Sequence, residues 1–237
     1  MRKLACLSAL CALLSGGGAQ ALSYGLVPFQ DGTTAVVARG TIDGNESARL
    51  LSFLEEASGS GGVPRTLVIS SPGGNMVSAL RLGLTLRQLG IRTVVGSIGQ
   101  DTFGQRALGA GQCHSACVLV LMAGVNRVVM PGSRVGVHSP QFLLVSQGRA
   151  YWVNGALTRT MVQGTEPVLR SYARHMGVSP AVIDVAHRVP HTGIRTLSSS
   201  ELAQYGLVTY GSARRIAPAT SPRRAAAAAR RVARSRS

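Results

Sequence analysis

The chain has 237 residues, a formal net charge of +16 and 45% hydrophobic residues. This length suits one domain with a sizeable core plus tails. The excess charge indicates a mildly basic domain with a basic tail, because eight of the arginines lie beyond Ser212 and no acidic residue accompanies them there. An arginine excess of this kind does not by itself indicate a nucleic-acid ligand.

The first 21 residues have the layout of a secretory signal peptide. Arg2 and Lys3 precede an apolar run over residues 4–14, and Ala19-Gln20-Ala21 predicts cleavage after Ala21. The apolar run is too short to span a bilayer. We therefore expect an exported protein, periplasmic or secreted, whose mature chain has lost Lys3, the only lysine.

The next segments alternate between strand and helix patterns. Residues 22–32 lack a clear pattern and predict a loose lead-in, while β-branched residues over 34–42 predict a strand. A helix is expected over 46–57. Buried strands are expected at 65–70 and 91–98, with an amphipathic helix over 76–90 between them. Strand, helix and strand in this order predict an α/β fold with parallel strands.

The second half is expected to be mostly helical. A polar, glycine-containing insert covers 99–112, and short strands are expected at 126–130 and 133–138, followed by helices across 151–187. A capped short helix then ends at Gly206 before a last strand. Residues 212–237 are rich in arginine and alanine and predict a disordered tail. The expected domain therefore covers residues 22–211.

Three short motifs carry groups suited to chemistry. The SPGG turn at 71–74 follows a buried strand, and its backbone N–H groups could hold an oxyanion, although glycines also simply permit a tight turn. Ser115 stands where a small-residue loop enters an apolar helix, as a nucleophile or merely as a helix cap. His138 ends the second short strand, where a histidine is a candidate general base or a structural residue.

The segment CHSAC at 113–117 allows three interpretations. Cys113, His114 and Cys117 are ligand types that zinc accepts, but no convincing fourth ligand accompanies them. Helical residues four apart have Cα atoms about 6 Å from each other, within the range for a disulfide. We expect a disulfide between Cys113 and Cys117 in preference to a metal site or two free, buried cysteines, and Ser115 between them as the nucleophile-type serine.

The order of these motifs resembles the proteolytic subunit of Clp protease, in the crotonase-like superfamily. The resemblance covers roughly residues 34–210, and PGSRVGVHSP and SSSELAQYGLV are its most specific segments. It implies a crotonase-like fold with Ser115 as nucleophile and His138 as general base. It further implies that the N–H groups of Gly73 and Ala116 form the oxyanion hole. The closest likeness is to an exported subgroup with a cysteine on either side of the serine.

The chain departs from that family at the acid of the triad. The position where the family has an aspartate is Ile194, which cannot orient an imidazole. Asp184 is the best substitute candidate for a third member, and Asp101 is a weaker one. A serine–lysine dyad is excluded because the mature chain would contain no lysine.

These observations predict an exported serine hydrolase, a peptidase, that uses a Ser-His pair and no cofactor or metal. The competing hypothesis is a catalytically inactive binding or scaffold protein that retains the fold. Expected partners are a peptide or protein substrate and copies of the chain itself, but no nucleic acid and no ATPase. The arginine-rich tail could make weak contact with an anionic membrane surface.

Overall fold

The computed structural model describes residues 20–29, 32–57, 63–100 and 106–209. Most of the expected signal peptide and all of the expected basic tail lie outside these ranges. Residues 20–22 are held firmly: the Thr41 amide donates to the Gln20 carbonyl at 2.7 Å, and Leu22 is fully buried. Among the described residues, no helix combines the length and the apolar character needed to cross a membrane.

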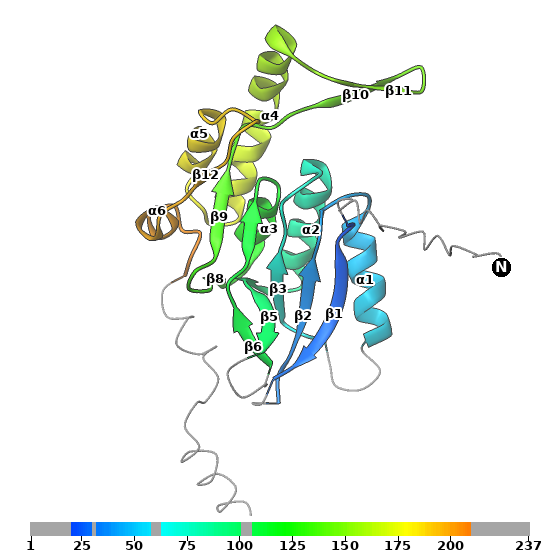
Figure 1. Ribbon diagram of the computed structural model, residues 1–237, viewed down its shortest axis with the longest axis vertical. Coiled ribbons are helices and arrows are strands. Elements are labelled where there is room, and N and C mark those ends of the chain that lie inside the picture. Colours follow the sequence, from blue (N-terminus) through cyan, green and yellow to red (C-terminus); the bar gives the residue numbers. More distant parts are fainter. Residues whose placement is uncertain (1–19, 30–31, 58–62, 101–105, 210–237) are drawn as a thin grey trace, which may run out of the picture.

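A five-stranded sheet forms the centre of the molecule (Figure 1). Its strand order is β1-β2-β3-β4-β8, and every neighbouring pair is parallel except β1 with β2. The strands are β1 (Ser23–Pro28), β2 (Thr34–Arg39), β3 (Thr66–Ser70), β4 (Arg92–Val95) and β8 (Arg127–Val129). The predicted α/β class with parallel strands is therefore confirmed.

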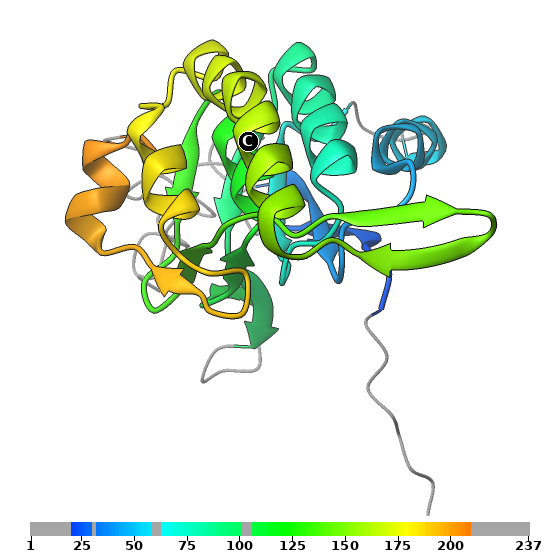
Figure 2. The same ribbon diagram turned by 90° about the horizontal axis from the view of Figure 1, so that it is seen from above.

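Helices cover one face of this sheet, and Figure 2 shows those of residues 46–57 and 76–88 above the strands. They are α1 (Glu46–Ala57), α2 (Met76–Gln88) and α3 (Cys117–Ala123). Alternate strand residues such as Ala38, Leu67 and Ile69 join the main core beneath the helices, whereas Val68 and Val94 belong to a smaller cluster on the opposite face. This division follows from the two-residue period of a strand.

The described parts of the polar insert form a pair of antiparallel strands on the face of the sheet opposite the helices. It consists of β5 (Ser97–Gln100) paired with β6 (Arg106–Gly109), and Leu108 packs against the smaller cluster. The single strand expected over 91–98 is interrupted at Gly96. A Cβ atom there would lie 2.9 Å from Met130 Cγ, so the chain turns from one sheet into the other at a residue without a side chain.

A second sheet carries the remaining functional segments. Its order is β12-β9-β7, with β7 (Gln112–His114) parallel to β9 (Arg134–Val137) and β12 (Arg195–Thr196) antiparallel to β9. The helices α4 (Gly155–His175), α5 (Ala181–His187) and α6 (Ser199–Gln204) follow in the C-terminal part. The predicted capped helix near the C-terminus is confirmed as α6, which has a capping box between Ser198 and Glu201.

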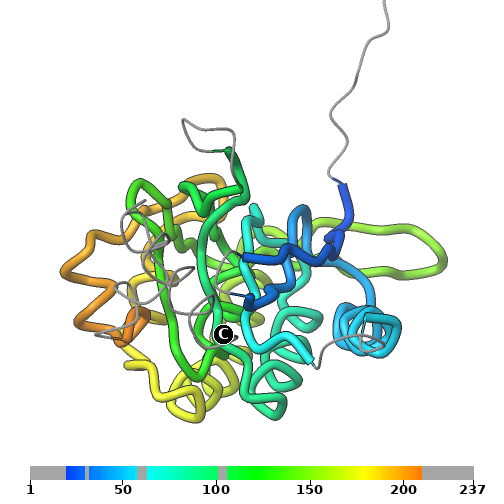
Figure 3. Tube along the Cα trace, turned by 90° about the horizontal axis from the view of Figure 1, so that it is seen from below, coloured from blue at the N-terminus to red at the C-terminus, as the bar shows by residue number. Residues whose placement is uncertain are grey.

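One expectation for the elements was wrong, and two others hold or are tested only in part. The expected loose lead-in is instead an ordered edge strand, β1. Its sequence has no clear strand pattern, and hydrogen bonds to β2 hold it in the sheet. The mostly helical pattern expected across 151–187 is confirmed by α4 and α5, except that its first two residues belong to β11 (Arg149–Trp152). This strand pairs with β10 (Leu143–Ser146) in a hairpin that projects from the body (Figure 3). No strand follows Gly206 in the residues described up to 209.

Candidate active site

The joint between the two sheets brings the SPGG turn to the CHSAC segment. Ser71, just beyond β3, donates its N–H to the Gln112 carbonyl at 2.8 Å and accepts from the His114 N–H at 3.1 Å. These two bonds extend the pairing of β3 onto β7. The turn that follows Ser71 therefore lies directly against Ser115, although about 40 residues separate them in the sequence.

Ser115 occupies a conformation that a simple helix cap does not need. Its φ is +55°, in the left-handed region, and its N–H donates to the Gly136 carbonyl at 2.8 Å. The helix α3 begins at Cys117, and no side chain caps it. A non-glycine residue held at positive φ is a feature that clusters at functional sites. The geometry thus favours the nucleophile interpretation of Ser115 over the cap.

The N–H of Gly73, the predicted oxyanion donor, has a hydrogen-bond partner in this structure. Gly73 is buried, and its N–H donates to the Ser71 hydroxyl at 3.1 Å, so this donor is already used. The next residue, Gly74, lines the pocket beside Ser115, and its N–H makes no hydrogen bond within the described residues. A serine that accepts from the N–H two residues later is a known turn motif, and this signal in SPG could have identified Gly74.

Ala116 provides a second free donor on the other side of Ser115. Its N–H precedes the first turn of α3 and has no acceptor among the described residues, and the residue lines the same pocket. The positive end of the α3 dipole adds to its attraction for an anion. Gly74 and Ala116 together offer the pair of backbone donors that a tetrahedral oxyanion requires.

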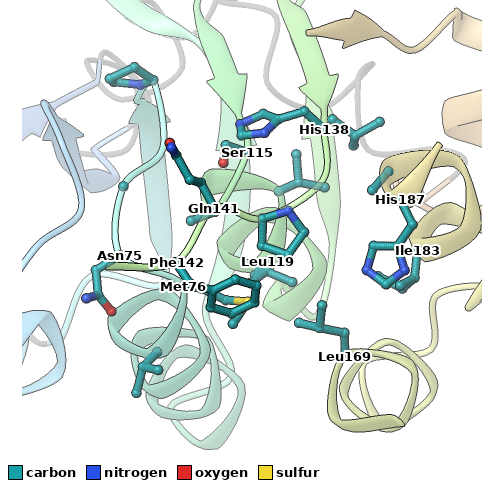
Figure 4. A pocket seen from close by; sticks show the side chains of 18 of the residues that line it. Asn75, Met76, Ser115, Leu119, His138, Gln141, Phe142, Leu169, Ile183 and His187 are labelled. Carbon is teal, nitrogen blue, oxygen red and sulfur yellow. The ribbon is translucent and has the colours of Figure 1, made fainter. Parts of the chain in front are cut away.

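His138 stands next to this loop because β7 and β9 are parallel neighbours. The register pairs His114 with Gly136, so Ser115 and His138 leave the sheet at the same end. Both line one pocket, and Figure 4 shows the Ser115 hydroxyl beside the His138 ring. No hydrogen bond joins the two side chains in this structure. Catalytic hydrogen bonds are often long before substrate binds.

The backbone fixes the tautomer of His138. Its Nδ1 lies 2.8 Å from the Ser139 carbonyl oxygen, which can only accept, so the proton resides on Nδ1. The Nε2 atom is then an unprotonated acceptor, as a general base must be. A carbonyl thus takes the orienting role that an acid has in a Ser-His-Asp triad, but without its negative charge.

The expected third member of the triad is not at His138. Asp184 on α5 forms an ion pair with Arg170 on α4, and no hydrogen bond links it to His138. Asp101, the weaker candidate, lies outside the described residues. Ile194 lies near the place where a complete triad would have its aspartate. Arg195 pairs with Val137, so continuing the register by one residue sets Ile194 opposite His138.

A disulfide joins Cys113 to Cys117, with their Cα atoms 5.1 Å apart. Both sulfur atoms are therefore unavailable as thiolate ligands, which removes the zinc interpretation of the CHSAC segment. The bond closes a short loop that carries Ser115 at its centre. It holds the end of β7 to the start of α3 across the strained residue.

Opening this disulfide should weaken the fold modestly. For a loop of this length, chain entropy predicts a loss of about 2 kcal/mol in the free energy of unfolding when both Cys113 and Cys117 are replaced by alanine. Urea unfolding measures the loss, and dithiothreitol should reproduce it in the wild type while leaving the double variant unchanged. Equal stability of oxidised and reduced wild type would contradict the prediction.

The pocket in front of Ser115 is mainly apolar and has a volume of about 640 Å³. Its walls come from α2, α3, α4, α5 and the segment after β9 (Figure 4). His114 lies behind the loop, where burial lowers its pKa, helped by the charges of Arg134 and His138. This shift favours the neutral form of His114.

Comparisons with known proteins do not name a family for this chain. No protein-family model and no curated protein matches it. Among solved structures, a mutant of 1510-N, a membrane-bound stomatin-specific protease, superimposes with a TM-score of 0.48 and 13% identity. The match covers 73% of this chain and 75% of that one. At this level of similarity, the functional argument has to come from the site itself.

Proposed function

We propose that the chain is an exported serine hydrolase of the peptidase type, built on a crotonase-like fold. The observation that carries the proposal is the convergence of Ser115, His138 and two unused N–H groups on one apolar pocket. Ser115 Oγ attacks the substrate carbonyl while His138 Nε2 accepts its proton. The N–H groups of Gly74 and Ala116 bind the oxyanion, and His138 then protonates the leaving amine.

Deacylation is the second half-reaction and completes hydrolysis. Water takes the place of the leaving amine, and His138 Nε2 removes its proton as the oxygen attacks the acyl carbonyl. His138 then returns this proton to Ser115 Oγ as the ester bond breaks and the acyl group leaves as a carboxylic acid. The Ser139 carbonyl keeps the imidazole oriented in both half-reactions. Its hydrogen bond from His138 Nδ1–H persists whether Ser115 or water is activated. Because no carboxylate of the described residues is hydrogen-bonded to His138, the proposal implies slow turnover compared with complete triads.

Covalent labelling tests the proposal. A fluorophosphonate probe should label the wild-type protein at Ser115, and Ser115→Ala should remove the label. Ser139→Ala is the matched control, because it removes a neighbouring hydroxyl but keeps the carbonyl that holds His138. Labelling that is absent from the wild type, or equal in Ser115→Ala, would instead favour the binding or scaffold protein, which Ile194 at the acid position also favours.

Export is part of the same proposal. The signal-like start predicts a mature protein that begins at Leu22, and the disulfide is of a kind that persists in oxidising compartments. N-terminal sequencing of the protein purified from its native host should read Leu22-Ser23-Tyr24. Recovery of a chain that still begins at Met1 would contradict the proposed location.

We also propose that copies of the chain associate through the β10–β11 hairpin. All residues of both strands are exposed, and Val145 and Trp152 have exposed fractions of 71% and 58%. A lone hairpin is marginally stable in water, so burial against a second copy would stabilise it. Val145→Glu should convert the assembly to monomers in analytical ultracentrifugation. Val63→Glu, at another exposed valine, should leave it intact.

A further inference from the structure

Ser71 has a buried polar side chain that the mechanism proposed above does not use. It directly follows β3, and its exposed fraction is 0%. A buried hydroxyl is costly unless it is hydrogen-bonded. The partners of this hydroxyl therefore indicate which part of the structure it holds in place.

Both partners of the Ser71 hydroxyl belong to Gly73. The hydroxyl accepts from the Gly73 N–H at 3.1 Å and donates to the Gly73 carbonyl at 3.4 Å. The backbone of Ser71 is fixed separately, by its hydrogen bonds with Gln112 and His114 at the joint between the two sheets. The side chain therefore ties Gly73 to a stretch of backbone that is already held firmly.

The Gly73 carbonyl sets the direction of the Gly74 N–H, because the two groups belong to one planar peptide unit. This peptide is trans, so its C=O and N–H point in opposite directions. The carbonyl accepts from the Ile42 N–H at 2.8 Å as well as from the Ser71 hydroxyl. The Gly74 N–H is therefore turned away from Ile42. Gly74 lines the pocket that also contains Ser115.

We propose that Ser71 is a positioning residue for the oxyanion hole, because its hydroxyl orients the peptide unit that presents the Gly74 N–H to the substrate. Gly73 and Gly74 have φ of +103° and +136°, a conformation that glycine enters and leaves easily. Ser71 supplies the restriction that the two glycines lack. The inference rests on the proposed function, since it takes the Gly74 N–H as an oxyanion donor.

Ser71→Ala should lower kcat for a p-nitrophenyl ester by about tenfold and leave KM within about twofold, because oxyanion contacts strengthen only in the transition state. Removal of a whole oxyanion donor costs about 10²–10³-fold. The loss is smaller here because Ile42 still holds the Gly73 carbonyl. Ser71→Thr retains a hydroxyl and should restore most of kcat.

Ser70→Ala is the matched control. The Ser70 hydroxyl accepts from the Gln112 N–H at 3.3 Å at the same joint, one residue before the turn. Both alanine variants lose one acceptor of a backbone N–H, so their melting temperatures should fall by similar amounts. A merely structural role for Ser71 would therefore change kcat equally in the two variants, whereas a positioning role changes it only in Ser71→Ala.

A peptide aldehyde reports on the oxyanion hole without turnover. Ser115 Oγ adds to the aldehyde carbon of acetyl-Ala-Ala-phenylalaninal, and its proton passes through His138 to the former carbonyl oxygen in the oxyanion hole. Calorimetry should show about tenfold weaker binding of the aldehyde to Ser71→Ala than to the wild type, in line with kcat. The alcohol acetyl-Ala-Ala-phenylalaninol cannot form the adduct and should bind both proteins equally.

The outcomes separate this inference from the proposed function. Equal kcat in the wild type and Ser71→Ala, an equal loss in Ser70→Ala, or a loss that appears in KM alone overturns the role of Ser71 and leaves the hydrolase intact. Ser71→Thr with the low kcat of Ser71→Ala overturns it as well. A wild type that hydrolyses no ester and binds the aldehyde no better than the alcohol overturns the proposed function, and the inference with it.

Discussion

Replacing Ile194 with aspartate should increase the rate of hydrolysis by about 10²-fold or more, since loss of the orienting aspartate in complete triads costs about 10⁴-fold. The strand register sets residue 194 opposite His138, and residues opposite each other have Cβ atoms about 5 Å apart. A carboxylate there can accept the hydrogen bond from Nδ1–H in place of the Ser139 carbonyl. It also supplies the negative charge that stabilises the imidazolium.

The substitution should be well tolerated, because Ile194 is 49% exposed and packs mainly on the backbone of Gly136. The measurement is kcat/KM for a p-nitrophenyl ester. Ile194→Asn is the matched control: it has the same shape as aspartate but no charge, and should give little gain. Similar rates for the two variants would show that charge at this position does not limit the reaction. The gain must also disappear in Ile194→Asp combined with Ser115→Ala.

The second large effect is expected from Gly73→Ala. A Cβ atom on Gly73 would lie 2.5 Å from the His114 carbonyl oxygen and 2.8 Å from Ser115 Cβ. The residue also has φ of +103°, where alanine is strained. Strain and overpacking together predict a loss of about 3 kcal/mol in the free energy of unfolding. Displacement of Ser115 should reduce kcat/KM by about 10²-fold.

Gly177→Ala separates the two causes. Gly177 also has a positive φ, +66°, but a Cβ atom there meets nothing within 4 Å. This control should show only the conformational cost, with unchanged kcat/KM. Thermal unfolding and ester hydrolysis measure the two effects independently. If Gly73→Ala behaved like Gly177→Ala, close contact between the SPGG turn and Ser115 could not be what positions the nucleophile.

The segments that meet at the candidate site were easiest to predict where a motif coincides with the end of a strand. SPGG, Ser115 and His138 each follow a buried strand, and parallel strands bring their carboxyl ends to one edge. The sequence did not reveal that the Gly73 N–H donates to the Ser71 hydroxyl, because this bond depends on where that hydroxyl points. The third member of the triad was wrong because the nearness of Asp184 to His138 depends on how α5 packs, and Arg170 competes for the carboxylate.

The fold was least predictable where tertiary partners decide the structure. β1 contains Gly25 and Pro28, which are unfavourable in strands, and it forms a strand because all of its residues pair with β2. The hairpin β10–β11 ends in Gln147-Gly148, both at positive φ, which is a turn signal that the helical pattern after it concealed.

On the proposed export route, the anchoring of residues 20–22 constrains when the leader can be removed. In the folded domain Ala21 is bridged to Thr41, and the Leu22 carbonyl accepts from Arg49 Nη2 at 2.6 Å. A peptidase needs an extended, unattached segment in its cleft, and this segment is already occupied. On the proposed export route, removal of the leader must therefore come before the first strand docks. A chain that folds too early would keep its leader.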